Sequence, residues 1–108
     1  MPRGPLDPEA AAAAAKEKAA PWHRALRRYL ESLALERGLA ANSVESYGRD
    51  LLRTGRALAK SGGDLLTVDS TALSAHVRDL RREGLSPRSI ARALASIRSF
   101  FQHLIEIE

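Results

Sequence analysis

Two groups of polar and basic side chains recur at helical spacing and could together bind a phosphate backbone. At about 100° per residue, each group falls on one side of a helix. The first group comprises Asn42, Ser46, Arg49, Arg53, Arg56 and Lys60, and the second comprises Arg88, Arg92, Ser96, Ser99 and His103. Guanidinium and hydroxyl groups donate hydrogen bonds to phosphate oxygens and base edges. Periodicity alone also allows a solvated polar surface in both places.

The sequence contains no other pattern that indicates chemistry. It has no cysteine, which excludes disulfides, thiolate metal sites and thiol nucleophiles. His23, His76 and His103 are scattered and do not form a metal-binding set. The glycine-rich motifs that cradle nucleotide phosphates are also missing. We therefore expect no catalytic residue, metal ion or cofactor, and the two basic faces remain as the functional candidates.

Each basic face lies opposite an apolar face, which predicts two amphipathic helices. One is expected from Ser86 to Ile107, with Ser86 as N-cap and Pro87 at the first helical position. Its apolar face comprises Ile90, Leu94, Ile97, Phe100, Phe101, Leu104 and Ile105. The other opens at residues 39–43 and ends near Lys60. Its buried side comprises Val44, Tyr47, Leu51 and Leu58, with Thr54 at the edge.

Two features of the helix ending at Lys60 bear on its packing and charge. Gly48 and Gly55 lie seven residues apart on the buried side, which predicts a close approach of another backbone. Glu45 and Asp50 flank the basic face, and their spacing allows ion pairs with Arg49 or Arg53 that would neutralise part of it.

Two further helices complete a four-helix bundle. Trp22, Leu26, Tyr29, Leu30 and Leu33 share the buried side of a helix over about residues 22–37. Asp69 is expected to cap a helix over about residues 70–83, and Leu65, Leu66 and Val68 form a buried connector before it. No strand pattern is present. The predicted fold class is all-α, with short loops between four helices.

Length and charge place these helices in one small domain. The chain has 108 residues and a net charge of +4, and residues 22–108 carry the whole excess, with fourteen basic and ten acidic side chains. We expect residues 22–108 to be the binding domain. Residues 1–21 are expected to be an alanine-rich, partly helical extension outside the core, capped by Asp7 and ended by Pro21. No apolar run spans a membrane, and a cytoplasmic protein is expected.

Four motifs along the chain resemble those of one family. They are Tyr29-Leu30-x-x-Leu33; Leu39-Ala40-Ala41-Asn42-Ser43-x-x-x-Tyr47-x-x-Asp50-Leu51; Gly84-Leu85-Ser86-Pro87-Arg88-Ser89-Ile90; and Phe100-Phe101-x-x-Leu104. Their order and spacing resemble the N-terminal core-binding domain of tyrosine recombinases, the Xer and phage integrase group. The resemblance covers about four-fifths of the chain and implies a four-helix orthogonal bundle of the SAM-like type.

This resemblance implies that the domain clamps duplex DNA. By motif position, Asn42 and Ser43 would hold phosphate, and Arg49 would lie near the backbone. Arg88, Ser89 and Arg92 would approach bases or phosphates, and Arg53 joins this set through the basic face. The partners implied are double-stranded DNA and the catalytic domain of the same enzyme, which would act as a tetramer on paired sites, while this chain alone could be a monomer.

The sequence departs from the family pattern in two respects. Ala40 stands where a capping serine is usual, so the helix after it should start less firmly. Gly48 stands where an arginine is frequent, which removes one phosphate contact. The H-x-x-R motif of the catalytic domain is absent, because each histidine is followed three places on by another residue type. The 108 residues are therefore not expected to cut or join DNA.

Two other function classes fit the same composition. A helix-turn-helix regulator could use the last two helices around the turn between Glu83 and Ser86, although it would be expected to dimerise. A helical protein-interaction module would treat the arginine faces as solvated surface.

Overall fold

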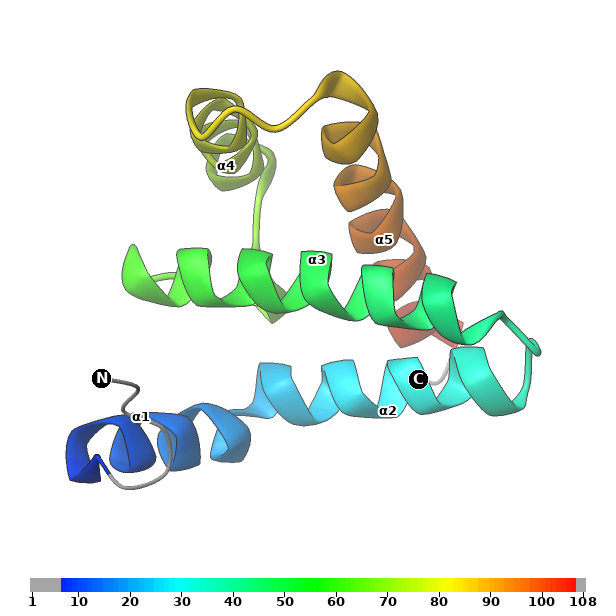
Figure 1. Ribbon diagram of the computed structural model, residues 1–108, viewed down its shortest axis with the longest axis horizontal. Helices are drawn as coiled ribbons and strands as arrows, with labels where there is room; N and C mark the ends of the chain where they lie inside the picture. The colour runs from blue at the N-terminus through cyan, green and yellow to red at the C-terminus, as the bar shows by residue number, and fades with distance from the viewer. Residues whose placement is uncertain (1–6, 107–108) are drawn as a thin grey trace.

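The computed structural model describes residues 7–106, and within that range it is all-helical, as predicted (Figure 1). Its elements are α1 (Pro8–Ala19), α2 (Pro21–Leu35), α3 (Ala41–Lys60), the short 3₁₀ turn η2 (Leu65–Thr67), α4 (Ser70–Arg82) and α5 (Pro87–Glu106). The expected end of α5 at Ile107 lies outside the described residues. Helices α2 to α5 correspond to the four predicted helices, and α1 to the alanine-rich extension.

Local capping chemistry explains most of the helix ends. The Asp69 carboxylate accepts from the Ala72 N–H at 2.8 Å, and the Ser86 hydroxyl accepts from the Ser89 N–H at 3.2 Å. Both N-caps were predicted. Gly84 connects α4 to α5 with a φ of 91°, a left-handed conformation that suits glycine. The expected lack of a side-chain cap at the start of α3 is confirmed, because Ala40 makes no such hydrogen bond.

Helix α3 is the central element of the bundle. Helix α2 runs antiparallel alongside it, while α5 crosses it steeply and α4 packs against both α3 and α5 (Figure 1). This arrangement buries the predicted apolar faces in one main cluster formed by Trp22, Leu26, Tyr29, Leu33, Leu51, Leu58, Leu65, Ile97 and Phe100. A second, smaller cluster of Leu80, Ile90 and Ala93 lies between α4 and the first half of α5.

The approach of another backbone predicted at Gly48 and Gly55 is wrong, because the close neighbour at each glycine is a side chain. A Cβ atom added to Gly55 would lie 2.4 Å from Cζ3 of Trp22, whose indole is 5% exposed. At Gly48 the added Cβ would lie 3.2 Å from Cδ1 of Leu30. The absence of a side chain at Gly55 therefore makes the room for the indole.

A buried polar contact joins α4 to α3. Thr54, predicted at the edge of the core, is fully buried, and its hydroxyl donates to the Asp50 carbonyl at 2.9 Å. Since that bond uses the only hydroxyl proton, Nε2–H of His76 is the donor in the 3.1 Å contact with Thr54 Oγ1. Burial lowers the pKa of His76 below its usual value of 6.5, so the ring is neutral at neutral pH.

The predicted polar face of α5 is wrong from Ser96 onwards. Ser96 and His103 are buried, and Ile105, expected on the apolar face, is 72% exposed. The reason is that α5 contacts both α3 and α2, so more than one side of it is covered. Ser96 satisfies its hydroxyl by donating to the Ala93 carbonyl at 2.7 Å, and the His103 ring packs against Tyr29.

Candidate nucleic-acid interface

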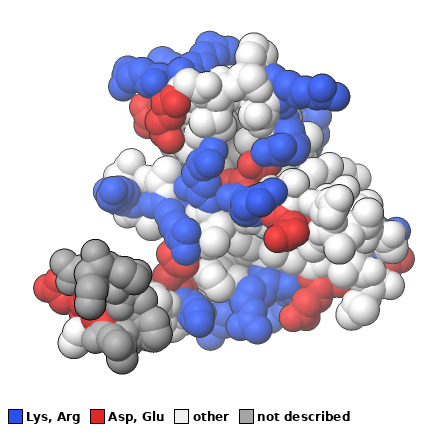
Figure 2. Space-filling model, in the orientation of Figure 1, with Lys and Arg blue, Asp and Glu red and all other residues white. Residues whose placement is uncertain are grey.

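The basic face of α3 is presented to solvent as predicted. Asn42, Arg49, Arg53, Arg56 and Lys60 are all exposed. Figure 2 shows Lys and Arg side chains gathered over α3 and again around α4 and the start of α5, with a few acidic residues between them. Arg49 is partly held in place, because its Nη2 donates to the Ser46 hydroxyl at 3.4 Å. The exposed face of α3 therefore offers several guanidinium groups along one side.

The first turn of α3 carries the predicted phosphate ligands Asn42 and Ser43. Asn42 is exposed, and Ser43 is half-buried. The Ser43 N–H donates to the Ala40 carbonyl at 3.0 Å, so this backbone group is already used within the helix. Ser43 can therefore offer a ligand its hydroxyl and not its amide, while Asn42 offers its exposed side chain.

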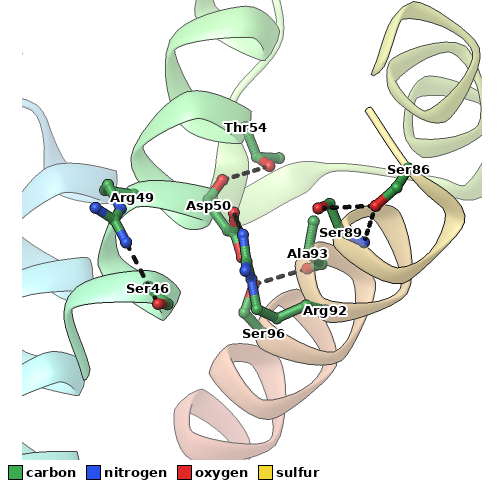
Figure 3. A network of polar contacts seen from close by, with 9 residues as sticks. All are labelled: Ser46, Arg49, Asp50, Thr54, Ser86, Ser89, Arg92, Ala93 and Ser96. Atoms are coloured by element: carbon green, nitrogen blue, oxygen red, sulfur yellow. Dashed lines mark hydrogen bonds and ion pairs between the residues drawn. The ribbon is translucent and has the colours of Figure 1, made fainter. Parts of the chain in front are cut away.

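The first turn of α5 brings Arg88 and Ser89 to the surface. Arg88 is exposed, and no ion pair involves it within residues 7–106. The Ser86 and Ser89 hydroxyls are linked at 3.1 Å, with Ser86 as donor. Figure 3 shows Ser89 and Arg92 on α5 and Arg49 on α3, on either side of Asp50. Arg92 of α5 and Asp50 of α3, 42 positions apart in sequence, thus meet where α5 crosses α3.

Arg92 differs from the other predicted ligands because it is ion-paired. Its Nε and Nη2 donate to the two carboxylate oxygens of Asp50 at 2.8 and 3.2 Å (Figure 3). This hydrogen-bonded pair raises the pKa of Arg92 above its already high value. The sequence-based alternative, in which Asp50 pairs with Arg49 or Arg53, is wrong, because Asp50 points towards α5 and not along the exposed side of α3.

One end of the basic face of α3 contacts the alanine-rich helix. Nε and Nη2 of Arg56 donate to the Glu17 carboxylate of α1 at 2.8 and 3.0 Å, and His23 lies 3.9 Å from the same group. The hydrogen bond with Arg56 lowers the pKa of Glu17 and raises that of Arg56. Sequence analysis missed this contact, since nothing in a neutral alanine-rich helix indicates which side chain it meets.

No cluster of three or more His, Asp or Glu side chains within residues 7–106 could hold a metal ion. Across the same residues, no helix has the length and apolar character needed to cross a bilayer.

Comparison with known proteins gives a consistent match. Residues 26–107 match the model of the family described as phage integrase, N-terminal SAM-like domain. The chain is 36% identical over 77 residues to tyrosine recombinase XerD of Caulobacter vibrioides, which covers 71% of this chain and 25% of that protein. It is 40% identical over 76 residues to XerD of Xanthomonas axonopodis pv. citri, with 70% and 25% covered. It is 39% identical over 79 residues to XerD of Listeria monocytogenes, with 71% and 27% covered.

The matches cover most of this chain but only part of its relatives. The chain spans about a quarter of the length of these curated relatives. No solved structure matches it significantly. The family match begins inside α2 and includes the whole of α3, α4 and α5, so it contains every predicted DNA-binding residue, whereas α1 precedes it. The chain belongs to the phage integrase family of N-terminal SAM-like domains.

Proposed function

We propose that this chain is the duplex-DNA-binding domain of a site-specific tyrosine recombinase. The residues assigned to DNA are Asn42, Ser43, Arg49, Arg53, Arg88, Ser89 and Arg92. The observation that carries the proposal is the contact between Arg92 of α5 and Asp50 of α3, which joins the polar start of α5 to the segment of α3 that also carries Arg49 and Arg53. Phosphate contacts fix the position of a protein on a duplex and contacts with base edges add sequence preference, so two adjacent polar segments can divide these two tasks.

Each helix has a distinct role in this proposal. The guanidinium groups of Arg49 and Arg53 neutralise phosphates along one strand. Arg88 and Ser89, at the start of α5, approach the groove, where a guanidinium and a hydroxyl can reach base edges. Residues 22–108 form the DNA-binding unit, and α1 is an extension outside it. The wider partners are the catalytic domain of the same enzyme and further copies in a tetramer on paired sites, acting in the cytoplasm.

The experiment is a fluorescence-anisotropy titration of a labelled duplex at several salt concentrations. The test variant is Arg49→Gln/Arg53→Gln, and the matched control is Arg24→Gln/Arg27→Gln, which removes the same charge from the exposed side of α2. Each lost phosphate contact should lower the slope of log affinity against log salt by about 0.9. The test variant should therefore bind more weakly with a slope reduced by up to about 1.8.

The control variant decides whether the surface or only the net charge matters. It should bind with a nearly unchanged slope. Equal weakening in both variants would refute the assigned surface, and Arg88→Ala should weaken binding independently of the α3 variant. A wild-type chain that fails to bind at low salt would refute the proposal and favour a protein-interaction module.

A further inference from the structure

The carboxylate of Asp50 is buried and fully committed to one partner. Its side chain is 5% exposed, and both of its oxygens accept hydrogen bonds from Arg92. A buried carboxylate is strongly unfavourable unless it is paired and hydrogen-bonded. The Arg92 side chain, in contrast, remains 46% exposed. The pair therefore lies at the boundary of the core, with the anion inside and part of the cation outside.

The geometry of the pair leaves donors free on the outer side of the guanidinium. An arginine has five N–H donors in a planar fork, and the contacts through Nε and Nη2 use two of them. The donors on Nη1 and the remaining one on Nη2 are not used by Asp50. In Figure 3 the Arg92 side chain extends from α5 to Asp50 on α3, so the guanidinium is fixed between the two helices.

A fixed guanidinium binds an anion with a smaller entropic penalty than a mobile one. A free arginine on a helix surface samples many rotamers and must lose them when it contacts a phosphate. Arg92 has lost this freedom already, in the folded domain. Its planar fork is also suited to bidentate contact with phosphate oxygens, which a lysine cannot reproduce.

We propose that Asp50 is a positioning residue, which holds Arg92 so that the outer donors of its guanidinium receive one phosphate of the DNA backbone. This inference rests on the proposed DNA-binding function. It assigns a role in DNA affinity to an acidic residue that itself never touches the DNA.

The positioning role and simple electrostatics predict opposite changes in DNA affinity when Asp50 is neutralised. Asp50 carries a negative charge close to the site where phosphate would lie, so its neutralisation should strengthen DNA binding if only charge mattered. If Asp50 positions Arg92, the Asp50→Asn variant should instead bind more weakly. The expected loss is about two- to tenfold, the range that corresponds to immobilising one long side chain.

The experiment is a double-mutant cycle of Asp50→Asn and Arg92→Ala, with duplex affinity measured by anisotropy and folding checked by circular dichroism. Asp50→Asn should weaken binding in the wild-type background and should leave it unchanged or strengthen it in the Arg92→Ala background. A gain or no change in the wild-type background, with a folded variant, would overturn the positioning role. So would wild-type affinity in Arg92→Ala.

A second variant keeps the test valid if Asp50→Asn does not fold. Arg92→Lys retains the positive charge beside Asp50. Its single ammonium group, however, cannot hydrogen-bond both Asp50 oxygens and a phosphate in the way that the planar guanidinium can. It should bind DNA nearly as weakly as Arg92→Ala, and affinity equal to the wild type would overturn the inference. Failure of the inference differs from failure of the proposed function, because in the first case the wild-type chain still binds DNA with a steep salt dependence and in the second case it does not.

Discussion

Substitution of Gly55 by alanine tests the packing at the centre of the bundle. A Cβ atom at this position would lie 2.4, 2.7 and 2.8 Å from three atoms of the Trp22 ring. Carbon atoms prefer separations of about 3.5–4.0 Å, so the ring must move. The indole is rigid and belongs to the main apolar cluster, so its movement disturbs the neighbours that pack on it.

Two opposing effects set the magnitude. Alanine is favoured over glycine inside a helix by about 1 kcal/mol, because glycine loses more backbone freedom on folding. Forcing an extra carbon into a filled core costs about 1–3 kcal/mol. Gly55→Ala should therefore leave the free energy of unfolding unchanged or lower it by up to about 2 kcal/mol.

Gly48→Ala is the matched control, since it is the same substitution in the same helix. Its Cβ would lie 3.2 Å from the end of the Leu30 side chain, which is flexible and half-buried and can yield. We expect this variant to be more stable than the wild type by up to about 1 kcal/mol. The difference between the two variants then measures the cost of displacing Trp22.

Thermal and urea unfolding, followed by circular dichroism, would measure this difference. For a domain of this size, 1 kcal/mol corresponds to about 4–8 °C in Tm. Gly48→Ala is expected to have the highest Tm, the wild type an intermediate Tm and Gly55→Ala the lowest. A Gly55→Ala variant that melts at or above Gly48→Ala would refute the packing argument.

Three further predictions concern polar contacts. Glu17→Gln should reduce the helical signal of α1 at 222 nm while changing core stability by less than about 1 kcal/mol, because the Arg56 side chain of this ion pair is exposed and solvent weakens the attraction; a large loss of core stability would contradict this. The folded-state pKa of His76 is lowered, so the unfolded chain binds more protons below pH 6.5, and the free energy of unfolding should fall as pH decreases from 6.5 towards the folded-state pKa. His76→Gln should flatten this dependence in urea titrations at a series of pH values, and an unchanged dependence would assign it to other groups. Tyr29→Phe removes the hydroxyl that donates to Ser99 at 2.7 Å and should lower the free energy of unfolding by about 1 kcal/mol, whereas a neutral result in urea would mean that the bond contributes nothing.

The sequence was sufficient for the features that depend on neighbours in the chain. The caps at Asp69 and Ser86 require only a side chain and an amide three residues on, and both are present. The break before Pro21 and the glycine after α4 are equally local. Helix periodicity also identified the exposed side of α3, because within residues 7–106 that side meets another helix only at Arg56, which pairs with Glu17 of α1.

The sequence was insufficient where a second or third helix decides the environment. Periodicity defines a polar and an apolar side for α5 but cannot tell how many neighbours cover it, which is why Ser96 and His103 were placed in solvent. Asp50 and Arg92 are 42 residues apart, and Glu17 and Arg56 are 39 apart. Their pairing depends on the angle at which helices cross, and no short-range pattern encodes that angle.

The division of the apolar interior into two clusters has a consequence for local unfolding. Helix α5 belongs to both: Ile97 and Phe100 lie in the main cluster, whereas Ile90 and Ala93 rest on the small one with Leu80. Segments with few buried contacts open locally at a lower free energy than global unfolding, so their amide protons exchange sooner. The start of α5 and the facing part of α4 should thus form the less protected unit. The segment that carries Arg88 and Ser89 could then adjust to the contour of a duplex while the main cluster stays closed.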